Sequence, residues 1–437
     1  MSLKWKRVLE LIPVQYRPFL DHEGFKKYFK NTGWMFIGQF FSLLISFFVG
    51  AAVARYLGPA NYGVYNYALS FVGLFSFIAP LGVDAILYRE LISQPQKRDE
   101  LMGTAFRLKL IGGVIAFLAA SVSAYFLEAD FLVKLIVLVF SISFIFQAFN
   151  VSYTFFNSRV QSLKNVKVQT LAVLFSAVLK IIVIVSFKGV IWLALAALIE
   201  SIIISVGAVY FYRQKGYRLR AWTFNPALAK KIISVSWLLL LSSAAALIYQ
   251  KVDQVMVGRF LGNEAVGLYA VAAKLSEIWY FIPGIICGSL FPAIVNAKKT
   301  GLNLYRDRLK KLYKLMLFLA LLIAVPLAVF SRPVTVIIFG PDYAASAPVL
   351  SIYAWSSLGF FLATAINQAL TSENRLRMIF SINLLMMVVN VFLNYLLIPR
   401  LGLTGAAWAT TVSYLLGPAY FMFYERGRNR KLKKAIG

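Results

Sequence analysis

Histidine and cysteine are almost absent from this chain of 437 residues, which contains one of each. Cys287 alone cannot form a disulfide within the chain, and with His22 it cannot build a histidine–cysteine metal site. No G-x-x-x-x-G-K-[ST] phosphate loop occurs, and no loop has room for a nucleotide-binding domain. We therefore expect no cofactor.

Charged residues are also scarce, at 14% of the chain, whereas 60% of residues are hydrophobic. This composition excludes an ordinary soluble protein. Because about 20 apolar residues cross a bilayer as a helix, we predict an all-α integral membrane protein. Twelve spans are expected, at 33–54, 64–88, 108–127, 131–154, 168–187, 188–212, 232–250, 266–294, 313–331, 345–370, 378–398 and 403–424.

The net charge of +28 is unevenly distributed between the two sides of these spans. Of the 45 Lys and Arg, 36 fall on the side that carries both termini. Basic loops stay in the cytoplasm, so we expect a cell-membrane protein with cytoplasmic termini and no nucleic-acid partner. The opposite side holds only Arg55, Lys188, Lys251, Arg259, Arg332 and Arg400.

Two segments 204 residues apart nearly repeat one another: VARYLGPANYGVY at 53–65 and VGRFLGNEAVGLY at 257–269. Six of their thirteen positions are identical. Both start on the same side of the membrane, which predicts two parallel six-helix lobes, as in many transporters. We expect an N-lobe at 33–212, a basic linker at 213–231 and a C-lobe at 232–424. A basic segment (1–32) precedes them, and it either lies as an amphipathic helix on the membrane surface or only sets the orientation of the protein in the membrane. A basic tail (425–437) follows.

Prolines interrupt several of the expected spans. Pro80 and Pro283 fall in the second and eighth spans, one position apart when the repeat is overlaid. Proline removes a backbone hydrogen bond and bends a helix. The paired breaks indicate either hinges and cavity walls or the ordinary kinks of membrane helices.

Ionisable residues inside spans are candidate sites, because charge within a bilayer is costly. Lys180 and Glu200 have similar expected depths in spans five and six, and either pair with each other or face a cavity. Lys274 and Glu277 share a face of span eight, being three residues apart, and have the same two alternatives.

Other polar residues have competing interpretations. Asp84 is expected either to be capped near Arg89 or to couple transport to an ion, and Asp253 to join an interfacial network or a gate. Arg55 and its repeat equivalent bind either lipid headgroups or phosphate. Intramembrane amides, among them Asn367 and Gln368, either bind sugar hydroxyls or bond neighbouring helices.

Three stretches resemble one family of proteins: RYLGPANYGVYNYALSFVGLFSFIAPLGVD at 55–84, KVDQVMVGRFLGNEAVGLYAVAAKLSE at 251–277 and NVFLNYLLIPRLGLTGAAWATTVSYLL at 390–416. They are similar to the polysaccharide transporters of the multidrug/oligosaccharidyl-lipid/polysaccharide (MOP) exporter superfamily. The resemblance implies a MATE-like, V-shaped pair of lobes around a cationic cavity. It also implies an O-antigen flippase-like activity on polyprenyl-diphosphate-linked oligosaccharide, by alternating access between the leaflets.

Two other function classes compete with this one. A cation-coupled multidrug exporter of the same fold would use acidic membrane residues to bind H⁺ or Na⁺, and composition does not separate the two. An integral-membrane polysaccharide polymerase or ligase would need a large outer loop, and none is expected here, so we predict no enzyme. A passive scramblase and contacts with polysaccharide-assembly proteins remain compatible with the sequence.

Overall fold

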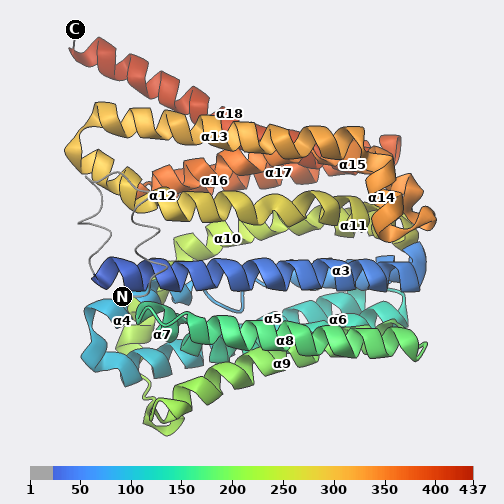
Figure 1. Cartoon of the computed structure of the whole chain (residues 1–437), viewed down its shortest axis with the longest axis horizontal. Coiled ribbons are helices and arrows are strands. Elements are labelled where there is room, and N and C mark those ends of the chain that lie inside the picture. The colour runs from blue at the N-terminus through green and yellow to red at the C-terminus, as the bar shows by residue number, and fades with distance from the viewer. Residues whose placement is uncertain (1–22, 437) are drawn as a thin grey trace, which may run out of the picture.

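The computed structural model describes residues 23–436, with side chains described for residues 33–427, and this part of the chain contains helices and no strands (Figure 1). The main helices are α3 (Glu23–Gly73), α4 (Val83–Ser93), α5 (Arg98–Leu127), α6 (Phe131–Phe146), α7 (Val151–Ser158), α8 (Leu163–Val185), α9 (Val190–Gln214), α10 (Pro226–Leu261), α11 (Asn263–Glu277), α12 (Phe281–Thr300), α13 (Leu302–Val329), α14 (Ser331–Phe339), α15 (Ala347–Tyr353), α16 (Ser356–Ser372), α17 (Leu376–Leu401) and α18 (Leu403–Ile436). Most of the expected segment 1–32 lies outside the described residues.

The helices are long and apolar enough to cross a membrane. Nine described stretches meet this criterion, or ten if the bent pair Pro341–Tyr353 and Ser356–Ser372 forms one span. The stretch 33–73 contains the first expected span and part of the second, because its helix is broken at Gly58. α18 does not meet the criterion, but it packs along α16 and α17 in the bundle. The predicted all-α, multi-pass membrane fold is confirmed.

The two halves of the chain lie on opposite sides of the bundle, with α4–α9 on one side and α12–α18 on the other (Figure 1). α3 packs against both α10 and α11, so these three helices form most of the contact between the halves. α3 begins and α18 ends at one end of the bundle, the left in Figure 1, which also carries the basic turns and is called here the basic end. The two-lobed arrangement agrees with the prediction.

The repeated segments form the same turn at the opposite end of the bundle. Gly58 has φ 69° and ψ 170°, and Gly262 has φ 87° and ψ 177°. Glycine reaches this backbone region without the steric cost that other residues meet. In each half the chain therefore reverses direction at a single glycine, and the next helix starts at once.

Just beyond these turns, the two halves touch through their backbones. A Cβ added to Gly63 would collide with the carbonyl of Asn263, and one added to Gly267 would collide with the carbonyl of Pro59. Pro59 and Asn263 are themselves 204 positions apart, like Gly63 and Gly267. The two contacts are therefore reciprocal, as expected for a two-fold relation between the lobes.

The repeated arginines also bond across the halves at this end. Nε of Arg55 donates to the carbonyl of Ile338 at 2.9 Å, and its Nη2 donates to the carbonyl of Ile337. Nη2 of Arg259 donates to the carbonyl of Leu127 and lies 3.3 Å from Glu128. Both arginines thus bind carbonyls in the last turn of a helix of the other half, where no intrahelical donor is available.

The second expected span is broken where Pro80 was noted. α3 ends at Gly73, residues 74–82 form successive turns, and α4 begins at Val83. Leu81 and Gly82 both have positive φ, at 48° and 66°. The corresponding helix of the other half changes only through the short 3₁₀ turn Ile278–Tyr280 between α11 and α12. The two halves therefore differ in this helix.

One expected span is too short. The apolar pattern predicted that the seventh span ends at residue 250, which placed Lys251 on the side with few charges. α10 instead continues to Leu261, so Lys251 lies within the helix. The placement of Lys251 on that side is therefore wrong, because Lys251 and Asp253 were taken to mark a helix end although the helix buries or shelters both.

Candidate substrate cavity

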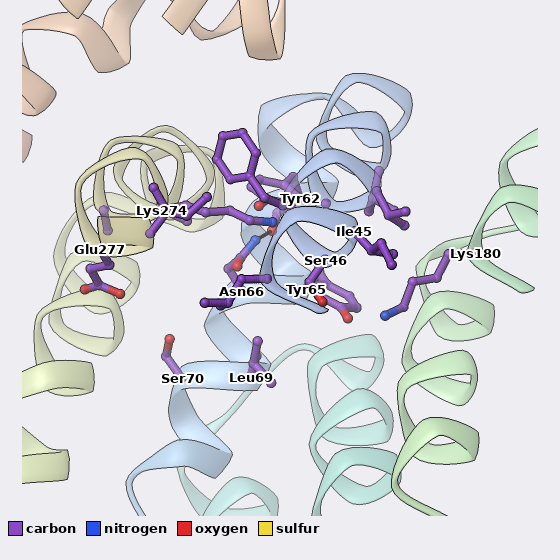
Figure 2. Close-up of a pocket in the computed structure, with 18 of the residues that line it drawn as sticks. Ile45, Ser46, Tyr62, Tyr65, Asn66, Leu69, Ser70, Lys180, Lys274 and Glu277 are labelled. Atoms are coloured by element: carbon purple, nitrogen blue, oxygen red, sulfur yellow. Dashed lines mark hydrogen bonds between the residues drawn. The ribbon is translucent and has the colours of Figure 1, made fainter. Parts of the chain in front are cut away.

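A cavity of about 370 Å³ lies at the contact between the two halves. Its walls come from α3, α8 and α9 of the first half and from α10 and α11 of the second. Figure 2 shows Lys180 and Lys274 reaching toward it from opposite sides of α3. Its polar lining residues are Ser46, Tyr62, Tyr65, Asn66, Ser70, Lys180, Glu200, Lys251, Gln254, Lys274 and Glu277.

Lys180 and Glu200 pair with each other and also line the cavity. Nζ of Lys180 lies 3.3 Å from Oε2 of Glu200, and both side chains are partly buried. The prediction that these two residues of adjacent spans lie at similar depth is therefore confirmed. Each charge offsets the other, which lowers the cost of holding both in an apolar bundle.

Lys274 and Glu277 line the cavity without pairing. Glu277 accepts a hydrogen bond of 2.7 Å from the hydroxyl of Tyr353. The ammonium of Lys274 instead lies against α3, in the space that a Cβ at Gly50 would occupy. Among the described residues no hydrogen bond or ion pair neutralises Lys274, so its charge is available to an anion in the cavity.

Lys251 is a cavity residue that the sequence reasoning missed. It lies one turn before Gln254 on α10, and both line the cavity. The ammonium of Lys251 has no ion-pair partner among the described residues. The repeat itself contained the signal, because Lys251 corresponds to Phe47, which lies well inside the first expected span.

Asp253 lies outside the cavity, in the interior of the second half. It is 1% exposed, and its carboxylate accepts hydrogen bonds from the hydroxyls of Tyr269 at 2.6 Å and Thr410 at 3.1 Å. No lysine or arginine of the described residues pairs with it. The interfacial network expected with Lys251 and Arg259 is therefore wrong, because α10 turns Asp253 inward.

Asp84 is not capped by Arg89, which bonds Glu90 instead at 2.9 Å. The partner of Asp84 is Lys109, whose Nζ lies 2.9 and 3.0 Å from the two carboxylate oxygens. The Lys109 side chain is 3% exposed, and Thr154 adds a third hydrogen bond to Asp84. This cluster follows the broken helix of the first half, and the sequence reasoning missed it because Lys109, the second residue of the expected span 108–127, was counted with the basic loop before it.

The remaining predicted site residues lie away from the cavity. Arg55 is at the far end of the bundle, where it bonds α14. Asn367 and Gln368 are on α16, a helix that contributes nothing to the cavity lining. Their proposed contact with substrate stays a prediction.

Comparisons with known proteins agree with this architecture. The family described as "Polysaccharide biosynthesis protein" matches residues 28–298, more than half of the chain, and the MatE family matches residues 239–396. The capsular polysaccharide biosynthesis protein CapF of Staphylococcus aureus is 23% identical over 414 residues, covering 91% of this chain and 99% of CapF. The probable flippase AglR of Haloferax volcanii is 27% identical over 253 residues, covering 55% of this chain and 50% of AglR.

Solved structures share the fold. An inward-facing MATE-family multidrug transporter of the MOP superfamily superposes with a TM-score of 0.76 at 15% identity, covering 90% of this chain and 96% of that one. The lipid II flippase MurJ gives 0.70 at 17% identity, covering 89% of this chain and 87% of MurJ. The chain therefore has the fold of these MOP-superfamily proteins, and its long apolar helices make it a multi-pass membrane protein. The chain belongs to the polysaccharide biosynthesis protein family.

Proposed function

We propose that this protein moves a polyprenyl-diphosphate-linked oligosaccharide from the inner to the outer leaflet of the cytoplasmic membrane. The observation that carries this proposal is the pair of unneutralised lysines, Lys251 and Lys274, in a cavity between two lobes. An ammonium held away from water attracts a phosphate strongly, because the low dielectric around it weakens screening. The relatives named as a capsular polysaccharide biosynthesis protein and as a probable flippase support a glycan-bearing lipid as the ligand.

Transport by alternating access requires the lobes to separate at each end in turn. The backbone contacts of Gly63 and Gly267 and the arginine bonds hold the end away from the termini together. We place the basic end in the cytoplasm, following the rule that basic loops are retained there. Release to the outer leaflet then requires the glycine and arginine contacts to break. A substrate that binds the inward-open and outward-open states with different affinity shifts the equilibrium between them.

The test is a lipid analysis combined with a transport assay. Deleting the gene should cause polyprenyl-diphosphate oligosaccharides to accumulate in the membrane lipids, as read by mass spectrometry, with loss of surface polysaccharide. Proteoliposomes with the purified protein should translocate the same lipid. Unchanged lipids together with raised sensitivity to toxic cations would replace this function with multidrug export.

Coupling to a cation is a second element of the proposal, favoured by the buried carboxylate of Asp253. Asn383 on α17 donates a hydrogen bond to Ser242 on α10. Asn394 lies eleven residues, about three turns, further along α17, and Asp253 lies eleven residues further along α10. The side-chain oxygen of Asn394 is buried and has no hydrogen-bond partner. A proton or a small monovalent cation would satisfy these oxygens, and its binding would bias the second lobe between two states.

The coupling is tested with Asp253→Asn, which keeps the size of the side chain, removes its charge and replaces one accepting oxygen by an amide that donates. Transport in proteoliposomes should lose its dependence on an imposed H⁺ or Na⁺ gradient. Asp307→Asn is the control, because Asp307 is an exposed carboxylate that pairs with Lys311 at the surface, so its loss leaves no buried charge. An unchanged gradient dependence in Asp253→Asn would remove the coupling role.

A further inference from the structure

The two walls of the cavity are built from equivalent positions but carry different charge. Gly50 touches Lys274 on one side, and Ser70 touches Gln254 on the other. Position 50 corresponds to 254 and position 70 to 274 under the 204-residue repeat, so these two contacts are related by the same two-fold relation as the glycine contacts. One member of the pair is a neutral hydrogen bond of 2.8 Å, and the other places a free ammonium beside a glycine.

The wall formed by the second half is therefore cationic. Lys251 and Lys274 are the charged donors there, and Glu277, which accepts a hydrogen bond from Tyr353, is the one carboxylate among the described residues of this wall, so two ammoniums and one carboxylate leave it a net charge of +1. Phe47 and Ser70 occupy the positions equivalent to the two lysines, so the first half contributes no free cation at those places. An anion in the cavity is drawn toward α10 and α11.

The wall formed by the first half is polar but neutral. The charges of Lys180 and Glu200 offset each other at 3.3 Å. Asn66 donates its amide to the carbonyl of Tyr62 at 2.8 Å, which leaves its side-chain oxygen as an acceptor. The ring of Tyr65 packs edge-on against Phe140, and no hydrogen bond is made by its hydroxyl within the described part of the chain. A planar ring with nearby donors and acceptors suits sugar hydroxyls better than phosphate.

We propose, building on the proposed function, that the cavity is divided between the two parts of the substrate. The diphosphate binds Lys251 and Lys274 on the second-half wall, and the first sugar binds Tyr65, Asn66 and the Lys180–Glu200 pair on the first-half wall. The second-half wall then recognises every lipid diphosphate, while the first-half wall determines which glycans are accepted.

Gly50 is a positioning residue in this arrangement. A methyl at position 50 would occupy the place of the Lys274 ammonium, which is the far end of a flexible side chain and can move aside. Gly50→Ala is therefore expected to fold while displacing the charge. Gly288→Ala on α12 is the matched control, because a Cβ there meets nothing within 4 Å.

The experiment measures binding of two purified probes in detergent: sugar-free polyprenyl diphosphate and the same lipid carrying its oligosaccharide. Lys274→Gln, Lys251→Gln and Gly50→Ala should weaken both probes by similar factors, about tenfold for the lysines. Tyr65→Phe and the charge-conserving double variant Lys180→Gln with Glu200→Gln should weaken only the glycosylated probe, by about three- to tenfold. Gly288→Ala should change neither. Thermal unfolding of each variant identifies any loss that comes from misfolding, and Tyr65→Phe provides a conservative second variant of the first-half wall.

The outcomes separate this inference from the function beneath it. If wild-type protein binds neither probe, the proposed function itself fails. If both probes bind but Tyr65→Phe and the double variant weaken the sugar-free lipid equally, the division of the cavity is overturned while the function stands. If Lys274→Gln weakens only the glycosylated probe, the assignment of the diphosphate to the second-half wall is overturned.

Discussion

The two copies of the repeated segment are alike at one end of the bundle and differ beside the cavity. At the far end, Gly58 and Gly262 make the same turn, and Gly63 and Gly267 make reciprocal contacts. One or two helical turns further on, Tyr65 faces the cavity, whereas its equivalent Tyr269 is fully buried. The shared part joins the halves, and the part that differs carries the charges.

The difference between the two tyrosines shows how the halves have specialised. The hydroxyl of Tyr269 donates to Asp253, and the residue equivalent to that aspartate in the first half is Val49. The first half therefore has no buried carboxylate at this place, and its tyrosine is left to line the cavity. A duplicated scaffold here holds a candidate ion site in one half and a polar wall in the other.

The largest effect is expected where the copies are alike. Gly63→Leu and Gly267→Leu each insert a side chain against a backbone carbonyl, and overpacking costs about 1–3 kcal/mol even where side chains can yield. Both variants should lower the unfolding temperature and abolish transport in proteoliposomes. Gly284→Leu is the control, since that glycine faces open space. A strong effect in only one of the two would contradict the reciprocal contact.

A second experiment transfers the charge from one wall to the other. Lys274→Ser should weaken binding of the sugar-free lipid diphosphate about tenfold, equivalent to about 1.4 kcal/mol. Adding Ser70→Lys and Gln254→Gly rebuilds the lysine–glycine contact at the equivalent place and should restore that binding. The glycosylated lipid should stay weakly bound, because its sugar then meets the wrong wall. Equal recovery of both ligands in a binding titration would show that the walls are interchangeable.

The smallest effect is expected at the arginines. Arg55→Gln and Arg259→Gln remove hydrogen bonds from charged donors, each worth about 1.5–3 kcal/mol when buried and less here, because both are exposed. The far end should open more often, raising hydrogen–deuterium exchange in the last turns of α14 and α5 severalfold at most. Lys188→Gln is the control at the same end. Unchanged exchange in both variants would remove the arginines from the closure.

The sequence predicted the helical architecture well, because apolar spans and basic loops are local signals and the repeated segment can be recognised without knowing the fold. It also predicted that Lys180 and Glu200 lie close together, since both fall in mid-span at similar depth. Lys251 and Lys109 were missed because a lysine near an expected helix end is indistinguishable from a loop lysine until the helix is seen to continue. The location of Asp253 depends on which face of α10 turns toward α11 and α18, and this is decided by packing across the bundle.

The buried position of Cys287 has a practical consequence for following these movements. It is the chain's only cysteine and is 1% exposed, so thiol reagents reach it poorly in the folded protein. A Cys287→Ser background with one cysteine introduced at the exposed position 60 and another at the exposed position 342 would carry a pair of spin labels and no others, and would keep the arginine bonds. The distance between the labels would then report directly how often the far end of the transporter opens during a cycle.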